Sequence, residues 1–195
     1  MNQLILVRHG QASSEGMEFG ALSALGVAQV EALADYWVRT GMPSGILHSG
    51  TLTRQRESAE IFATGLRKSA IQCITKDAQT DFDELDHLAV LRAFAHAQNP
   101  DIGIDAAWDP FRNDKEKLRK TLRPALKAWA RREIEVPVGK SWNEFRARCV
   151  PAAKATVPDN APPNPVTIFT SAGVIAACMQ EALELFDADA ALVQL

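Results

Sequence analysis

Short, continuous apolar runs, each followed by a helical pattern, recur along this chain of 195 residues. Leu4 to Val7 and Val166 to Thr170 are the clearest, and Gly45 to His48 and Ile71 to Thr75 are similar. A run of this kind is typical of a strand that is buried on both faces, and strands that alternate with helices indicate a parallel sheet. We therefore expect an α/β fold with a mainly parallel central sheet flanked by helices.

Capping signals and apolar periodicity place the helices between these strands. Ser23 has the side chain of an N-cap, and Gly41 supplies a stop after a helical stretch. The segment 86–150 is mostly helical in pattern, and Pro124 is expected to kink or divide one of its helices. We interpret 86–150 as a helical insertion or cover within a single domain that spans 1–195.

Composition narrows the classes of partner. The net charge is −3 and the isoelectric point about 5.8, so no basic footprint for nucleic acid is predicted. No apolar run reaches the roughly 18 residues of a membrane span, and the N-terminal run is too short for a signal-peptide core. Three widely spaced cysteines predict neither a disulfide framework nor a zinc site. We expect a cytoplasmic protein that binds neither nucleic acid nor membrane, and the sequence leaves its oligomeric state open.

Polar residues gather where three of the predicted strands end. The segments are Arg8 to Gln11, His48 to Arg54, and Ser171 to Gly173. Ligands of open α/β sheets collect beyond the carboxyl ends of the strands, so these segments are expected to meet in space. Helix N-termini favour an anion, and arginine offers forked donors to phosphate oxygens. The sequence therefore predicts a phosphate or carboxylate site.

Four motifs in this order resemble those of the histidine phosphatase (phosphoglycerate mutase-like) superfamily. They are Leu6 to Ala12, Leu22 to Gln29, Arg54 to Ala59, and Phe82 to Asp86. One Arg-His-Gly alone would be a weak signal, whereas four ordered motifs make a specific one. The resemblance covers the chain from Met1 to about Phe186 and implies a three-layer sandwich with a mainly parallel central sheet.

The resemblance also implies a role for each matching residue. His9 would attack a phosphoryl group and become a phosphohistidine, which water then hydrolyses. Arg8 and Arg54 would hold the phosphate oxygens, and Glu84 would protonate the leaving oxygen and later activate the water. No metal and no organic cofactor are implied.

The chain departs from the family pattern in two places. The family has a second histidine after the last long strand, where this chain has Ser171, followed by Ala172. We expect Ser171 and Ala172 to contribute to phosphate binding, with turnover more affected than binding. The second departure is the end at Leu195, where family members usually continue to a further strand, so we expect a fold trimmed at one edge.

Each assignment has a structural alternative. A histidine after a strand can be an ordinary surface residue, Arg54 can be a surface helix arginine, and an acidic cluster such as that around Glu84 is often simply solvated. His48 could replace the missing second histidine, although an ordinary polar role is the simpler interpretation.

The sequence therefore predicts a phosphatase that forms a phosphohistidine and acts on a small phosphorylated substrate or a phosphoprotein. The alternative is a catalytically impaired pseudophosphatase that binds phosphorylated ligands or partner proteins. Mutase activity is a third and weaker prediction, because it normally relies on both histidines.

Overall fold

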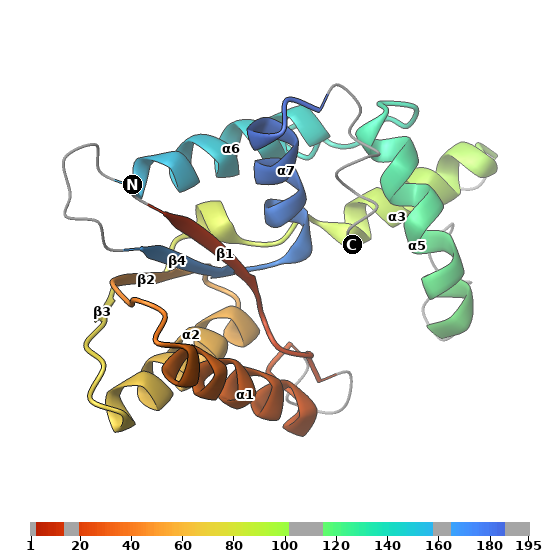
Figure 1. The fold of residues 1–195 in the computed structure, drawn as a ribbon. Coiled ribbons are helices and arrows are strands. Elements are labelled where there is room, and N and C mark those ends of the chain that lie inside the picture. Colours follow the sequence, from red (N-terminus) through yellow and green to blue (C-terminus); the bar gives the residue numbers. More distant parts are fainter. Residues whose placement is uncertain (1–2, 14–19, 102–114, 158–164, 186–195) are drawn as a thin grey trace. The chain divides into compact units, whose positions relative to one another are not determined.

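The structure, a computed structural model, forms two compact units (Figure 1). The residues that it describes are 3–13, 20–101, 115–157 and 165–185. The first unit comprises Met1–Glu84 and Cys149–Ile175, and the second comprises Leu85–Arg148 and Ala176–Leu195. The second unit contains most of the segment 86–150, and the role of that segment as a cover within a single domain stays a prediction.

A parallel sheet of four strands lies at the centre of the first unit. In spatial order the strands are β1 (Leu4–Arg8), β4 (Val166–Thr170), β2 (Ile46–Ser49) and β3 (Ile74–Thr75). The pairing is parallel throughout, with Arg8 beside Thr170 and Ser49 beside Phe169. The predicted sheet is confirmed, and the carboxyl ends of β1, β4 and β2 lie at one edge of it.

The third predicted strand is the one that differs. Ile71 to Thr75 was expected to be extended, but only Ile74 and Thr75 pair with β2. The Ile71 N–H donates to the Leu66 carbonyl at the end of α2 at 3.0 Å, so the start of this segment closes the helix and does not pair with β2. Ile74 and Thr75 are themselves exposed at the edge of the sheet.

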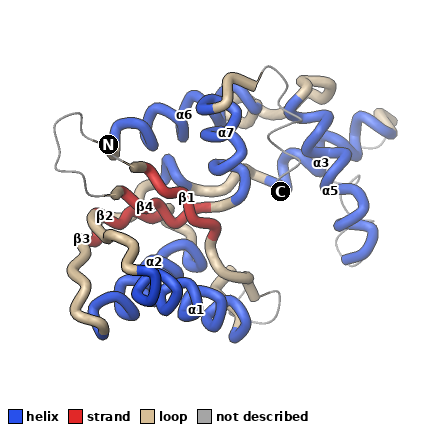
Figure 2. Tube along the Cα trace, viewed as in Figure 1, coloured by secondary structure: helices blue, strands red, loops and turns tan. Residues whose placement is uncertain are grey.

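Helices α1 (Ala24–Thr40) and α2 (Thr53–Lys68) lie along one face of the sheet, as Figure 2 shows. The part of α6 (Trp142–Ala155) that belongs to this unit lies over the opposite face. Ser23 caps α1 as predicted, because its hydroxyl accepts a hydrogen bond from the Gly26 N–H at 3.1 Å. Gly41 ends α1 in the left-handed conformation.

An aromatic chain joins these helices to the sheet. Trp37 of α1 meets Phe62 of α2 edge-on at 5.2 Å between ring centroids, and Phe62 lies 5.2 Å from Phe169 of β4. Phe62 and Phe169 are fully buried, and Trp37 nearly so. Burial of each such ring contributes about 1.5–3 kcal/mol, so this cluster holds the helices on the sheet and fixes the strand ends beside them.

The second unit is helical. It contains α3 (His87–Gln98), α5 (Lys115–Ala130), the start of α6 and most of α7 (Ala172–Ala182). Pro124 lies inside α5, which runs from Lys115 to Ala130 without a break, so the proline does not divide the helix. Buried packing of Ala125, Leu126 and Trp129 outweighs the one backbone hydrogen bond that proline removes. Within the described ranges, no helix has the length and apolar character needed to cross a bilayer.

His48 is a buried residue of β2. Its ring meets Phe82 edge-on at 6.2 Å, and its Nδ1 has no hydrogen-bond partner among the described residues. Burial lowers the pKa of His48 below its ordinary value of 6.5, and the charge of Lys76 acts in the same direction. This environment suits a neutral imidazole in a structural role.

Acid is therefore expected to destabilise the protein through His48. The unfolded chain binds more protons near pH 6.5 than the folded chain does, so this stabilisation is fully present above pH 6.5 and is lost as the pH falls below it. Urea unfolding at about pH 7.5 and about pH 5.5 measures the loss, which should be smaller in His48→Leu. An equal loss in His48→Leu and the wild type would contradict the prediction.

Candidate active site

Backbone hydrogen bonds bring the ends of the strands together within the first unit. The His9 N–H donates to the Thr170 carbonyl at 2.9 Å, and the Gly50 N–H donates to the Phe169 carbonyl at 3.1 Å. The segment after β1 and the segment after β2 thus both border the end of β4. A 3₁₀ turn, η2 (Thr80–Phe82), precedes Asp83 and Glu84 at the same edge.

The loop after β1 reaches this position because two glycines allow close backbone contact. A β-carbon at Gly10 would lie 2.4 Å from the Gly26 carbonyl oxygen, and one at Gly26 would lie 2.2 Å from the Gln11 carbonyl oxygen. The Gly10 N–H also donates to the Ser58 hydroxyl at 3.1 Å, and that hydroxyl donates to the Arg54 carbonyl at 2.7 Å. The loop is therefore tied to the first turn of α2, next to Arg54.

His9, Arg54 and Glu84 form one connected group. Arg54 Nε donates a hydrogen bond to His9 Nε2 at 3.1 Å, and Arg54 Nη2 forms an ion pair with Glu84 Oε2. The side chains of Arg54 and Glu84 keep 16% and 19% of their surface exposed, so an anion from solvent can reach them. Three residues from three separate segments of the sequence are thus in direct contact through the guanidinium group of Arg54.

The hydrogen bonds of His9 define its tautomer. Nδ1 lies 2.7 Å from the Gly10 carbonyl oxygen, which only accepts, so Nδ1 carries the hydrogen. Nε2 accepts from Arg54, so it carries no hydrogen and its electron pair is engaged in that hydrogen bond. Burial lowers the pKa of His9 below 6.5; the Gly10 bond and Glu84 oppose this change, while Arg54 and Arg8 support it. Burial is the main cause of the lowered pKa.

The other predicted phosphate ligands are next to His9 in the sequence or follow the end of β4, the strand that pairs with β1. Arg8 is the exposed last residue of β1, and Ala172 is the first, half-buried residue of α7. Ser171 is fully buried, and its Oγ accepts a hydrogen bond from Gln55 Nε2 at 2.9 Å. Phosphate binding by these three residues stays a prediction.

The sequence analysis did not predict the roles of two residues at this site, Asp83 and Gln55. Asp83 is not simply solvated, because its carboxylate accepts from the Thr51 N–H at 2.5 Å and from the Thr51 hydroxyl at 2.6 Å. Gln55 is fully buried beside Ser171. Its position could have been found, since Gln55 precedes Ala59 by one helical turn on the apolar face of α2.

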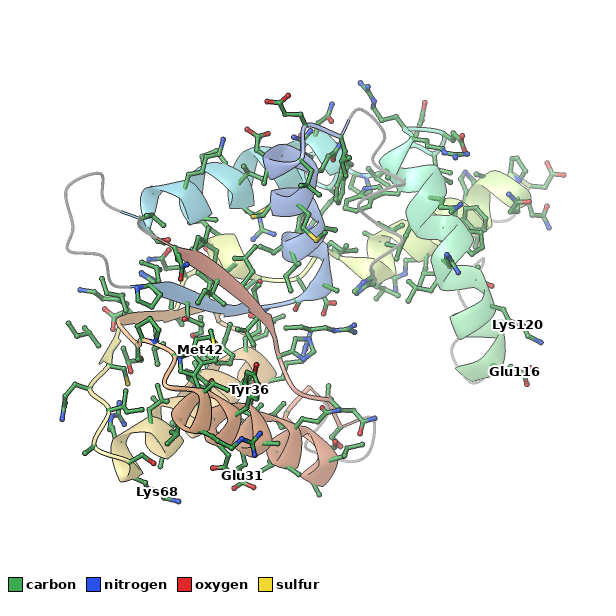
Figure 3. The ribbon with its side chains drawn as sticks, in the orientation of Figure 1. Glu31, Tyr36, Met42, Lys68, Glu116 and Lys120 are labelled. Atoms are coloured by element: carbon green, nitrogen blue, oxygen red, sulfur yellow. The ribbon has the colours of Figure 1, made fainter. Side chains whose placement is uncertain are left out.

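A groove between α1 and α2 is a less suitable place for phosphate. Its lining includes four carboxylates and one ammonium group: Glu31, Asp35, Glu57, Glu60 and Lys68. Figure 3 shows Glu31 and Lys68 among the side chains of these helices. A surface with this excess of negative charge repels a phosphate dianion, whereas the strand ends present Arg8 and Arg54.

The buried position of Ser171 predicts that a larger side chain there is costly. Ser171→His is expected to lower the free energy of unfolding by about 1–3 kcal/mol, because the ring must enter space that Gln55 fills. Adding Gln55→Ala should recover part of the loss. Urea midpoints of the two variants and the wild type provide the measurement, and a Ser171→His protein as stable as the wild type would contradict it.

The chain matches the model of the histidine phosphatase superfamily (branch 1) over residues 4–90 and 105–194, and it belongs to that superfamily. Phosphoryl transfer is the general chemistry that this membership supports. No curated protein matches the chain in sequence. Within the described ranges, no cluster of three or more His, Cys, Asp or Glu side chains is arranged to hold a metal ion.

Solved structures share the fold at low sequence identity. A mycobacterial glucosyl-3-phosphoglycerate phosphatase in complex with vanadate is 21% identical, with a TM-score of 0.59 over 98% of this chain and 85% of that one. A phosphoserine phosphatase from Entamoeba histolytica is 16% identical, with a TM-score of 0.53 over 99% and 85%. A phosphoglycerate mutase from Bacillus anthracis is 14% identical, with a TM-score of 0.51 over 92% and 79%. The phosphoglycerate mutase-like fold is thereby confirmed.

Proposed function

We propose that this chain hydrolyses a phosphomonoester through a phosphohistidine at His9. The observation that carries the proposal is the tautomer of His9, whose Nδ1 hydrogen is held by the Gly10 carbonyl while Nε2 keeps its electron pair. A nucleophile needs a free electron pair at neutral pH, and the lowered pKa of His9 supports the neutral form.

In the first step, Nε2 of His9 attacks phosphorus while the bond from phosphorus to the ester oxygen breaks. The electron pair of that bond goes to the leaving oxygen, which takes a proton from Glu84. Before the attack, the hydrogen bond from Arg54 Nε to Nε2 breaks and Arg54 donates to the phosphoryl oxygens instead, with Arg8 as a second cation. Phosphoryl transfer depends chiefly on such positioning and charge stabilisation.

In the second step, water attacks the phosphorus of the phosphohistidine. Glu84 accepts a proton from the water, the bond between phosphorus and Nε2 breaks, and its electron pair returns to His9. Inorganic phosphate and the starting protonation states result. The contact between Arg54 and Glu84 supports this assignment, because it places the carboxylate beside the arginine that would hold the phosphate.

The proposed substrate is a small phosphomonoester or a phosphoprotein, and the scheme needs neither a metal nor an organic cofactor. Two of the structural relatives are named for phosphomonoester substrates, which agrees with this class. The cytoplasm is the proposed compartment, in agreement with Cys73, Cys149 and Cys178, none of which is in a disulfide among the described residues.

Rapid-mixing hydrolysis of p-nitrophenyl phosphate tests the proposal. If formation of the phosphohistidine is faster than its hydrolysis, p-nitrophenolate appears in a burst of about one equivalent per site. During that burst, acid-labile phosphate should be trapped on the wild type and be absent from His9→Ala. A burst without any phosphate bound to His9 would contradict the proposed route.

The pH dependence of kcat/KM should show an acidic limb that belongs to His9 and a plateau above it. His9 must be neutral to attack, and burial lowers its pKa, so activity is lost on the acidic side only as the pH falls below 6.5. A rate that rises steadily into strongly alkaline solution would contradict this prediction and favour a metal hydroxide mechanism.

A catalytically impaired protein that binds phosphorylated ligands is the second candidate. It is favoured by Ser171, which is fully buried and bonded to Gln55 in place of the second histidine. Binding of orthovanadate without any turnover of p-nitrophenyl phosphate would support this candidate over the enzyme.

A further inference from the structure

Gln55 connects three segments that border the site. Its Nε2 donates to the Ser171 hydroxyl oxygen at 2.9 Å and to the Phe82 carbonyl at 3.1 Å. Its Oε1 accepts from the Leu52 N–H at 3.3 Å. The side chain is fully buried, so these bonds are made away from bulk water, where an unmade bond costs about 1–3 kcal/mol.

We propose that Gln55 is a positioning residue that acts with Ser171 to hold Glu84 in place beside Arg54. This inference rests on the proposed function and adds residues to it. In this arrangement Ser171, which stands where the family has the second histidine, holds the side chain of Gln55 by a hydrogen bond. The Ser171 oxygen accepts a hydrogen from Gln55, and Ser171 has no exposed surface.

The segment before Glu84 is held from two sides. The Phe82 carbonyl accepts from Gln55 and also from the Thr170 hydroxyl at 2.6 Å, so both of its electron pairs are used. The next residue, Asp83, accepts two hydrogen bonds from Thr51 at the start of α2. Glu84 follows directly and reaches Arg54 with its carboxylate.

Gly50 shows how closely this group is packed. A β-carbon there, directly after β2, would lie 2.0 Å from Gln55 Oε1 and 2.8 Å from Asp83 Oδ1, so any larger residue would displace these two side chains. Such packing leaves the segment 82–84 little freedom to move. A general acid must lie within hydrogen-bond reach of the leaving oxygen, and a displacement of about 1 Å can lower the rate about 10²-fold.

The choice of substrate separates positioning of Glu84 from a merely structural role. A p-nitrophenolate leaving group departs with little help from an acid, whereas an alkoxide leaving group needs the proton. Gln55→Met is expected to lower kcat/KM for glycerol 2-phosphate about 10-fold to 10²-fold, and kcat/KM for p-nitrophenyl phosphate much less. This constant reports only the steps up to departure of the leaving group, so the later role of Glu84 as a base does not affect it. Glu84→Gln should show the same preference, and the double variant should lose little more than Glu84→Gln alone.

Gln180→Met is a matched control. Gln180 is another buried glutamine, which accepts from the Trp142 indole at 3.0 Å and donates to the Leu185 carbonyl at 3.1 Å. This variant is expected to lose stability while the ratio of the two activities stays as in the wild type. Ser171→Ala provides a second test if Gln55→Met does not fold. It should also lower activity on glycerol 2-phosphate more than activity on p-nitrophenyl phosphate.

The outcomes distinguish the two proposals. If the wild type is no more active than His9→Ala on either substrate, the proposed function fails and this inference fails with it. If activity depends on His9 but Gln55→Met, or Ser171→Ala in its place, lowers both activities equally or neither, only the role of Gln55 is overturned. A selective loss of activity on glycerol 2-phosphate supports both the proposed function and the positioning role of Gln55.

Discussion

Replacing His9 with alanine is expected to lower kcat for p-nitrophenyl phosphate by at least about 10³-fold, because no other group takes over the attack on phosphorus. Arg54 and Glu84 remain in the variant, so binding of orthovanadate should be weakened far less than turnover. This difference follows from the geometry, in which His9 supplies the electron pair and Arg54 supplies the charge. Steady-state kinetics together with vanadate titration measure both quantities.

His96→Ala is the control for the His9 experiment. His96 lies in the last turn of α3, outside the proposed machinery, so its loss should leave kcat unchanged. Thermal unfolding verifies that both variants are folded. A His9→Ala protein with kcat close to that of the wild type would refute the assignment of His9 as nucleophile.

Replacing Arg54 with lysine is expected to lower kcat/KM about 10²-fold, although the positive charge is kept. The guanidinium donates to His9 through Nε and to Glu84 through Nη2 at the same time, and one ammonium group cannot reproduce this fork. Kinetics with p-nitrophenyl phosphate measure the loss. The fall should appear in kcat as well as in KM, because the fork serves the transition state as well as binding.

Arg56→Lys is the matched control on the same helix. Arg56 is exposed two residues further along α2, so the same substitution should leave kcat/KM unchanged. Equal and small effects of the two substitutions would show that Arg54 contributes only charge at the surface. In that outcome, phosphate would have to be held elsewhere.

Local patterns were sufficient for most of the fold. The apolar runs gave the strands β1, β2 and β4, and the cap residues Ser23 and Gly41 gave the bounds of α1, since capping and periodicity depend on neighbours within one or two turns. Local preference alone did not give every element. The strand expected from Ile71 is shortened to Ile74 and Thr75, because the Ile71 N–H bonds to the Leu66 carbonyl, and Pro124 lies within a continuous α5.

For the site as well, local patterns predicted some features and tertiary packing decided the others. The sequence placed His9 and Arg54 at strand ends because a strand-to-helix junction is recognisable from the residues on either side of it, and the superfamily motifs named the same residues. It could not give the contact between Arg54 and His9, which lie 45 residues apart, or that between Gln55 and Ser171, which lie 116 apart. Those contacts exist because the parallel order of β1, β4 and β2 brings their carboxyl ends together. The sequence thus indicated which residues belong to the site. Which of their side chains form hydrogen bonds with one another was decided by tertiary packing, because a buried polar group must find a hydrogen-bond partner among its neighbours in space.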